Sequence, residues 1–182
     1  MLEDLGRGVV STMAAASRTG LAEEILGDLE RAEAIMRPAV ETLFAMGEKS
    51  FVSTLAAQLA RVLALRGKLD EAAHFANSGR EASPPDDWAS QVSWRSALCQ
   101  VMARRGDLEE AEGLAREAVA LTSGVDYLNH IGDCWVDLGE VLGLSGRPDE
   151  AGDAMREALR MYEAKGNVVS ATRTRQALAG LI

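Results

Sequence analysis

His130, Asp133 and Cys134 are the residues whose types and spacing come closest to a metal site. His130 and Cys134 stand four residues apart, so on a helix they share one face, and an imidazole and a thiolate are both Zn²⁺ ligands. The whole chain has only two His and two Cys, so a closed four-ligand site lacks partners. We therefore expect Cys134 to pack in a core, and we predict neither a metal nor another cofactor.

Nucleophilic and acid–base catalysis have equally weak support. Cys99 becomes a nucleophile only if a base lies beside it, and nothing in the sequence places His74 there. Carboxylates occur in pairs at expected helix starts or turns, where capping and solvation account for them: Glu23-Glu24, Asp86-Asp87 and Glu109-Glu110. The sequence therefore predicts that the protein is not an enzyme.

Composition and charge exclude several classes of fold and partner. Apolar residues make up 47% of the chain and aromatic residues only 4%, with Ala and Leu the commonest types, which favours helix over strand. The formal net charge of −9 is the opposite of what a grip on nucleic acid or on anionic lipid requires. No run approaches the roughly 18 apolar residues of a membrane span. The first residues, Met1 to Asp4, do not resemble a signal peptide, so we expect a cytoplasmic protein with reduced thiols.

A six-residue pattern occurs four times and organises the chain. It reads Gly, any residue, Leu or Pro, an acidic residue, any residue, Ala, and its spacings are 40, 39 and 40 residues; it begins at Gly27, Gly67, Gly106 and Gly146. Gly readily adopts the left-handed conformation that ends a helix. The next residues begin a new helix, with Asp28 and Asp107 as predicted N-caps. The pattern therefore predicts helix pairs whose Ala residues face neighbouring helices closely.

Amphipathic segments between these turns predict helices at 30–46, 50–66, 69–82, 87–105, 108–122, 126–145, 148–165 and 168–181. Within 1–26, the glycines Gly6, Gly8 and Gly20 weaken any long helix. We expect an incomplete N-terminal repeat there, made of a first helix and a short second piece. Residues 167–182 are expected to form a C-terminal capping helix, and 1–182 a single domain. Such helix pairs bury their apolar faces only by stacking, which predicts an all-α solenoid of antiparallel pairs.

The segment around Gly146 resembles a tetratricopeptide repeat. The residues at the motif's Trp, Leu, Gly, Tyr and two small-residue positions are, in order, Trp135, Leu138, Gly139, Leu142, Ala151 and Ala158. The period here, about 40, is longer than the roughly 34 residues of the standard motif. The resemblance implies a TPR-like superhelix with a concave groove.

A narrower resemblance rests on four runs, 45–50, 85–95, 101–106 and 164–171. They resemble the C-terminal helical-repeat region of large, chiefly actinobacterial signalling proteins. Those proteins carry a class III adenylate/guanylate cyclase domain and an AAA-type ATPase module before the repeats. The chain has no Gly-x-x-x-x-Gly-Lys-Ser/Thr phosphate loop, so the resemblance implies a repeat module without those activities.

The groove positions of the tetratricopeptide motif project onto a polar set of mixed charge. The set comprises Thr54, Ala57, Arg61, Ser93, Ser96, Gln100, Arg104, Asp133, Val136 and Glu140, with Asn129 extending the row. A peptide or a small polar ligand suits such a surface, and a solvated face without a ligand is the alternative. Trp88, which follows a Pro-Pro turn, is either an exposed anchor for a partner or a packing residue.

Together these features predict a non-catalytic interaction or scaffold module, the sensor or interaction arm of a bacterial signalling or transcription-regulating protein. The expected partner is a protein or peptide segment, or another domain of a larger parent protein. Binding of a metabolite in the groove is the alternative, and an enzyme is a remote one. A homodimer through a terminal helix is also expected, because an apolar helical end needs a cap or a second copy.

Overall fold

The computed structural model describes residues 2–180 and, within them, the side chains of residue 11 and of residues 13–180. This part of the chain forms helices and contains no strand. The helices are α1 (Leu2–Leu26), α2 (Leu29–Ala45), α3 (Ser50–Leu65), α4 (Leu69–Ala82), α5 (Trp88–Arg105), α6 (Leu108–Leu121), α7 (Leu128–Leu144), α8 (Pro148–Lys165) and α9 (Val168–Ala179). The predicted all-α class is confirmed, and the helices predicted after residue 29 begin and end within two residues of the observed ones.

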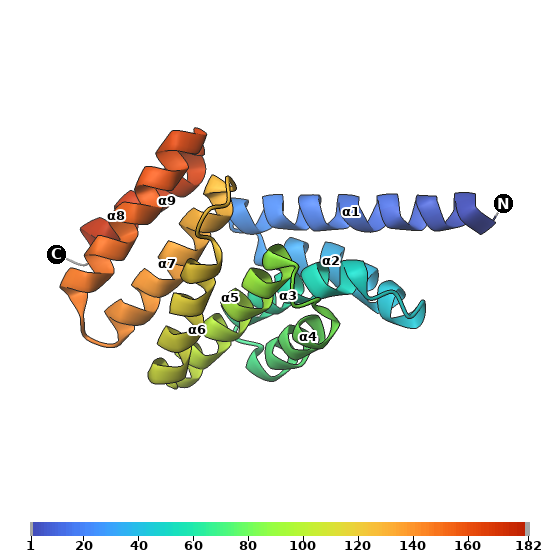
Figure 1. The fold of residues 1–182 in the computed structure, drawn as a ribbon, viewed down its shortest axis with the longest axis horizontal. Coiled ribbons are helices and arrows are strands. Elements are labelled where there is room, and N and C mark those ends of the chain that lie inside the picture. The colour runs from blue at the N-terminus through green and yellow to red at the C-terminus, as the bar shows by residue number, and fades with distance from the viewer. Residues whose placement is uncertain (1, 181–182) are drawn as a thin grey trace.

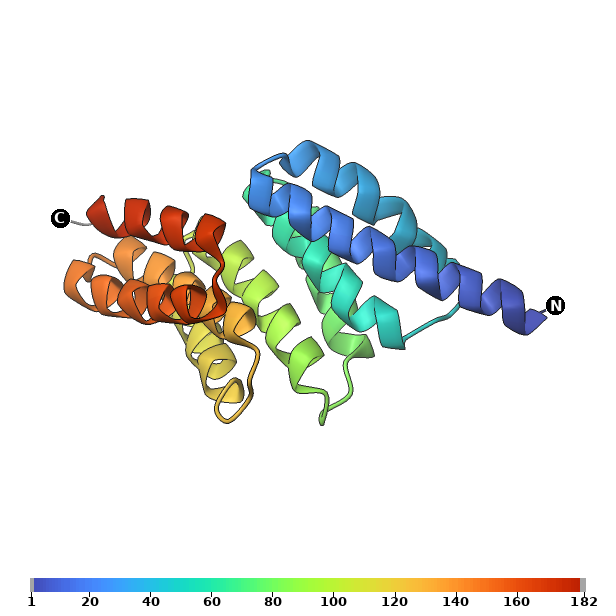
Figure 2. The ribbon, with the colours of Figure 1, turned by 90° about the horizontal axis from the view of Figure 1, so that it is seen from above.

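The helices pair in chain order and the pairs stack (Figure 1). α1 packs on α2, α3 on α4, α5 on α6 and α7 on α8, and α9 adds a single helix on α8. The first helices also contact one another from pair to pair, α1 with α3, α3 with α5 and α5 with α7. Successive pairs are turned relative to one another, as the view from above shows (Figure 2). The architecture is an α-solenoid whose inner face carries the first helices.

Small residues of the repeated pattern lie where the helices of a pair approach. The pattern's Ala residues are fully buried in every repeat, namely Ala32, Ala72, Ala111 and Ala151. Two turns further along the second helix, each repeat again has a buried small residue: Ala39, Gly79, Ala118 and Ala158. At Gly79 a Cβ would lie 3.0 Å from the carbonyl oxygen of Ser53. Helices α3 and α4 therefore come too close for a larger residue there.

The turns between paired helices follow the predicted chemistry at most points. Gly27, Gly67, Gly106 and Gly146 all have positive φ, at 88°, 77°, 91° and 73°. The Asp28 carboxylate accepts a hydrogen bond from the backbone N–H of Arg31 at 3.0 Å, as an N-cap should. The corresponding prediction for Asp107 is wrong, because its side chain makes no capping hydrogen bond.

The predicted break in residues 1–26 is also wrong, because α1 is one continuous helix through Gly6, Gly8 and Gly20. Gly20 is the place where α2 crosses: a Cβ there would lie 2.5 Å from the Cε of Met36. Its glycine thus serves close packing rather than a turn. One turn earlier on α1, Ser17 Oγ donates to Gln58 Oε1 of α3 at 2.6 Å, so α1 contacts both α2 and α3.

Candidate functional site

A cavity of about 480 Å³ lies on the inner face of the solenoid, between its first and last helices. Its wall combines charged, polar and apolar side chains from α1, α3, α7, α8 and α9, with the α1–α2 turn at its edge. The lining residues are Glu24, Ile25, Gly27, Leu29, Arg61, Leu65, Asp133, Val136, Glu140, Met155, Tyr162, Ser170, Arg173, Thr174 and Ala177. Residues far apart in the sequence therefore meet at one site.

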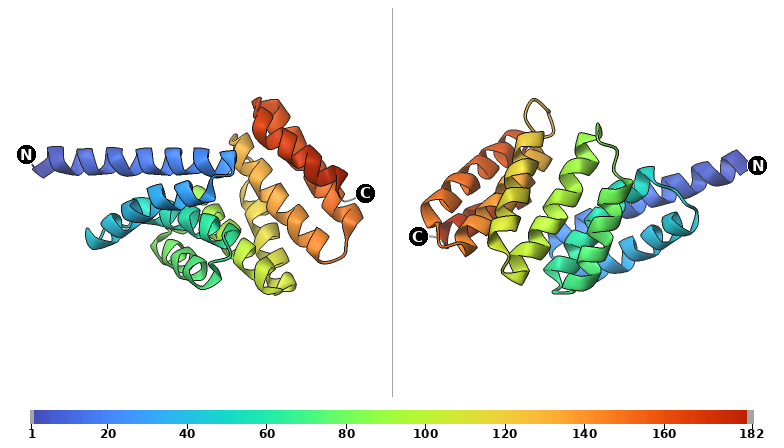
Figure 3. Two further views of the ribbon diagram at one scale, coloured as in Figure 1. Left: turned by 180° about the vertical axis from the view of Figure 1, so that it is seen from behind. Right: turned by 60° about the horizontal axis from the view of Figure 1, so that its bottom comes forward.

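The turn of the superhelix brings these distant helices together. The C-terminal end of α1 points toward the C-terminal helices (Figure 3), and residues of α1, α7 and α9 line one cavity. At Gly27, in the α1–α2 turn, the position of a Cβ is only 3.2 Å from the Nη2 of Arg173 on α9. The turn of the stack over its four pairs thus brings α9 against the α1–α2 turn.

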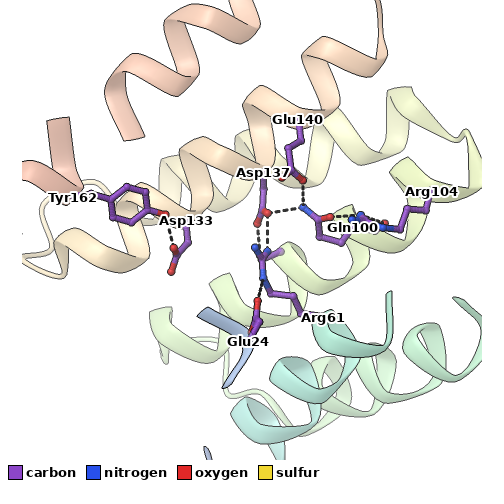
Figure 4. A network of polar contacts seen from close by, with 9 residues as sticks. Glu24, Arg61, Gln100, Arg104, Asp133, Asp137, Glu140 and Tyr162 are labelled. Carbon is purple, nitrogen blue, oxygen red and sulfur yellow. Dashed lines mark hydrogen bonds and ion pairs between the residues drawn. The ribbon is translucent and has the colours of Figure 1, made fainter. Parts of the chain in front are cut away.

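Arg61 of α3 contacts polar side chains of the other three helix pairs, through Glu24, Ser96 and Asp137. Its Nε donates to Glu24 Oε1 of α1 at 2.9 Å, and its Nη1 donates to Asp137 Oδ1 of α7 at 2.7 Å. Figure 4 shows the guanidinium between these two carboxylates. The side chains of Glu24 and Asp137 are 13% and 2% exposed, so both ion pairs are largely shielded from water. The charge of Arg61 is thus already balanced within the protein.

The network continues along α5. Ser96 Oγ donates to the second carboxylate oxygen of Asp137, and Gln100 Nε2 bonds to Asp137 Oδ1 at 2.6 Å and to Glu140 Oε2 at 2.9 Å. Arg104 donates to the side-chain oxygen of Gln100. Asp137 and Gln100 are each 1% exposed. A buried carboxylate is tolerated only when it is fully paired, and Asp137 meets this requirement with three partners.

Asp133 lies one turn before Asp137 on α7 and faces the cavity. The Tyr162 hydroxyl of α8 donates to its Oδ1 at 2.5 Å. The carboxylate remains accessible from the cavity, yet desolvation by the surrounding wall raises its pKa above the ordinary value. The Asp137 charge acts in the same direction, while Arg61 and the Tyr162 hydroxyl act against it. Burial also raises the pKa of Tyr162, so its hydroxyl stays a donor.

The structure brings together most of the groove residues projected from the sequence. Six of them lie in the network or beside it: Arg61, Ser96, Gln100, Arg104, Asp133 and Glu140. Val136 also lines the cavity.

Four other predicted positions lie apart from the cavity. Ser93 Oγ donates to the Ala89 carbonyl of its own helix, and Thr54 is half-buried on α3. Ala57 is buried where α4 crosses at Gly79. Asn129 accepts a hydrogen bond from Asn167 Nδ2 at 3.1 Å, which ties α7 to the start of α9.

Trp88, for which the sequence left an exposed anchor and a packing residue as alternatives, is half-buried at the start of α5. It packs near Val92, Ala118 and Cys134. Its ring centroid lies 5.2 Å from that of Tyr127 and 6.0 Å from that of His130. The packing interpretation of Trp88 therefore fits this arrangement better than a free anchor does.

The sequence projection missed most of the lining, including the charged or hydrogen-bonding residues Glu24, Tyr162 and Arg173, and it also missed Asp137 of the network. One of them left a signal. Asp133, Asp137 and Glu140 have the spacing of one helix face, so an acidic stripe on α7 was visible in the sequence. The others depend on how far the solenoid turns, which no local pattern records.

The two cysteines considered for chemistry pack in the core, whereas His130 and Asp133 are exposed. Cys99 and Cys134 are buried, and desolvation raises the pKa of each thiol, which disfavours the thiolate. Among the described residues, no group of three His, Cys, Asp or Glu side chains is arranged to hold a metal ion. None of the described helices is long and apolar enough to cross a membrane.

Comparisons with known proteins agree with this architecture. Two family models of the tetratricopeptide repeat match, one over residues 91–164 and one over residues 54–76. No curated protein matches the chain.

Several solved structures share the fold at low identity. BtubC (BKLC) from P. vanneervenii is 16% identical with a TM-score of 0.55, and the match covers 100% of this chain and 91% of that one. PilF of Pseudomonas aeruginosa is 17% identical with a TM-score of 0.57, covering 96% and 78%. A chain of nearly identical TPR-like repeats from Podosopora anserina is 16% identical with a TM-score of 0.57, covering 93% and 94%. The chain thus matches the tetratricopeptide repeat over residues 54–76 and 91–164 and folds as an all-α repeat solenoid.

Proposed function

We propose that this protein is a non-catalytic interaction module whose inner-face cavity binds a short segment of a partner protein. Tetratricopeptide repeats serve protein–protein interaction and scaffolding, which supports the class of function. The observation that carries the choice of surface is the cavity itself, which gathers side chains from the first, second and fourth helix pairs and from α9. Its volume of about 480 Å³ accepts a few side chains but no folded domain.

The proposed consequence of binding is mechanical. A segment in the cavity contacts the end of α1 and also α9, so it favours the curvature in which these helices approach each other. In a larger parent protein, that change reaches whichever domain is joined to either end. The resemblance of 27–182 to the repeat region of cyclase–ATPase signalling proteins supports such a regulatory arm.

Metabolite sensing is the second candidate. The observation in its favour is that the cavity volume falls within the range of small-molecule sites, about 300–1,000 Å³. Polar side chains and apolar side chains converge on it, as such a site needs. Mass spectrometry of small molecules released when the protein is denatured after purification from its source cells tests this candidate.

The proposal for a protein segment is tested by selecting peptides from a display library on the wild-type protein. Each selected peptide is then assayed against Ala177→Trp, which fills the cavity from α9, and against Ala120→Trp, which adds the same ring on the exposed face of α6. We expect binding to be lost with Ala177→Trp and kept with Ala120→Trp. Peptides that bind all three proteins equally would contradict the proposal.

A further inference from the structure

The charges around the cavity do not cancel. Three carboxylates line it, those of Glu24, Asp133 and Glu140, and the buried Asp137 carboxylate lies directly behind them. Two guanidinium groups line it, those of Arg61 and Arg173. The sum is a local excess of negative charge, in a protein whose formal net charge is −9.

The internal pairing leaves the excess on one wall. Arg61 forms ion pairs with Glu24 at 2.9 Å and with Asp137 at 2.7 Å, so its charge is balanced within the network. Arg104 bonds to the side chain of Gln100, which lies between Arg104 and Asp137 (Figure 4). Asp133 and Glu140 have only neutral hydrogen-bond donors as direct partners among the described residues, Tyr162 and Gln100. Their two charges face the cavity. Arg61 partly offsets that of Asp133, and Arg173 of α9 lies near the α1–α2 turn at the edge of the same cavity.

Asp133 and Glu140 form an acidic wall of the cavity, and apolar side chains form another part of its lining. They stand seven residues apart on α7, which places them on the same face at about 10 Å along the helix axis. Val136 lies between them. Side chains of Ile25, Leu65 and Met155 supply apolar surface to the same cavity.

We propose, resting on the function proposed above, that the bound segment presents a lysine or arginine side chain to Asp133 and Glu140. Long basic side chains combine an aliphatic stem with a charged head, so the stem packs on the apolar wall while the head reaches the carboxylates. A neutral occupant removes water from both carboxylates without supplying a counter-charge, and an acidic occupant is repelled by them. The excess negative charge of the whole chain also steers a basic segment toward the site.

The test uses three five-residue peptides of the form Ser-Leu-Xaa-Leu-Ser, acetylated and amidated, with lysine, norleucine or glutamate in the centre. Dissociation constants are obtained from amide chemical shifts of the cavity-lining residues during titration. We expect the lysine peptide to bind most tightly and the glutamate peptide most weakly. The preference for lysine over norleucine should shrink as salt is raised, because the pairing is partly exposed.

Variants of the acidic wall make the test specific. Asp133→Asn and Glu140→Gln each keep a hydrogen-bond acceptor for Tyr162 and Gln100, so the fold is retained. Each should weaken the lysine peptide about three-fold and leave the norleucine peptide unchanged. Asp153→Asn, which removes an exposed carboxylate of α8 outside the cavity, should change neither.

Several outcomes overturn the inference. One is a glutamate peptide that binds as tightly as the lysine peptide or more tightly. Another is a wall variant, Asp133→Asn or Glu140→Gln, that leaves the dissociation constant of the lysine peptide unchanged. An absence of shifts at the cavity with all three peptides also overturns the basic-residue preference. The proposed function is judged separately, because peptides selected from a library and blocked by Ala177→Trp would sustain it whatever their charge.

Discussion

At the residue scale, Arg61 is the side chain on which the inner face depends most. It is 23% exposed and bonds to carboxylates of α1 and α7. Removing the guanidinium leaves Asp137 buried with one fewer partner and without its counter-charge. We expect Arg61→Met to lower the free energy of unfolding in urea by about 3 kcal/mol or more. Arg160→Met, in an exposed pair with Glu157, should change it by less than about 0.5 kcal/mol. Equal effects of the two variants would mean that the network contributes little.

Replacing Asp133, unlike replacing Arg61, should not destabilise the protein. The pKa of its carboxyl is raised in the folded protein, so its ionised form destabilises the fold above the folded pKa. This destabilisation disappears as the pH falls below the unfolded pKa, where the group is protonated in both states. We therefore expect Asp133→Asn to melt at the same or a higher temperature than the wild type near pH 7, with the difference shrinking toward about pH 3. A lower melting temperature near pH 7 would indicate that Asp133 serves structure rather than binding.

At the element scale, close helix contacts depend on glycine in α7. A Cβ at Gly132 would lie 2.7 Å from the ring of Tyr162, whereas a Cβ at Gly113, on the open side of α6, meets nothing within 4 Å. Gly132→Ala should therefore destabilise the protein by about 1–3 kcal/mol through overpacking. Gly113→Ala should stabilise it by about 0.5–1 kcal/mol, because alanine restricts the unfolded chain. Thermal unfolding of the two variants checks this opposite sign.

Helix α2 is joined to its neighbours through Glu33, which is 6% exposed. Burial raises the pKa of this carboxyl, but hydrogen bonds and charges from Lys68 and Arg37 outweigh it, so the net pKa lies below the ordinary value. Arg66 adds a third contact at 2.6 Å. A lowered pKa means stabilisation that is present above the unfolded pKa and lost as the pH falls through the folded one.

We therefore expect Glu33→Gln to be less stable than the wild type near pH 7 in urea unfolding. The two proteins should converge as the pH falls from the ordinary carboxyl pKa of about 4.3 through the lower folded pKa, because the wild-type carboxyl becomes neutral there too. A constant difference across this range would contradict a role for the Glu33 charge.

Most elements were predictable from the sequence because their signals are local. Helices 69–82 and 148–165 were predicted with their observed bounds, since a glycine turn and an apolar period mark them. The long helix α1 was not, because its glycines resemble turns until the partner that crosses at Gly20 is known. In α1, packing against neighbouring helices outweighs the low helix propensity of glycine.

At the scale of the whole molecule, the cavity exists because the solenoid turns far enough for α1 and α9 to face each other (Figures 2 and 3). Positions on first helices, such as Arg61 and Glu140, were predictable because the motif fixes which side of a helix faces inward. Glu24 and Arg173 were not, because their approach depends on the rotation between successive pairs.

Self-association through a terminal helix stays a prediction. Its motivation is the exposure of Val168 and Val169, 73% and 46%, at the start of α9. Sedimentation equilibrium of the wild type and of a Val168→Ser, Val169→Ser variant tests it. A concentration-dependent dimer that the double substitution abolishes would agree with a contact through α9, and a monomer at all concentrations would exclude it.

The most direct test of the inner-face cavity as the binding surface is an amide chemical-shift map of the protein with one display-selected peptide. We expect the largest shifts at the end of α1, on the inner side of α3 and α7, and along α9. Shifts confined to α4 and α6, on the outer face of the solenoid, would contradict it.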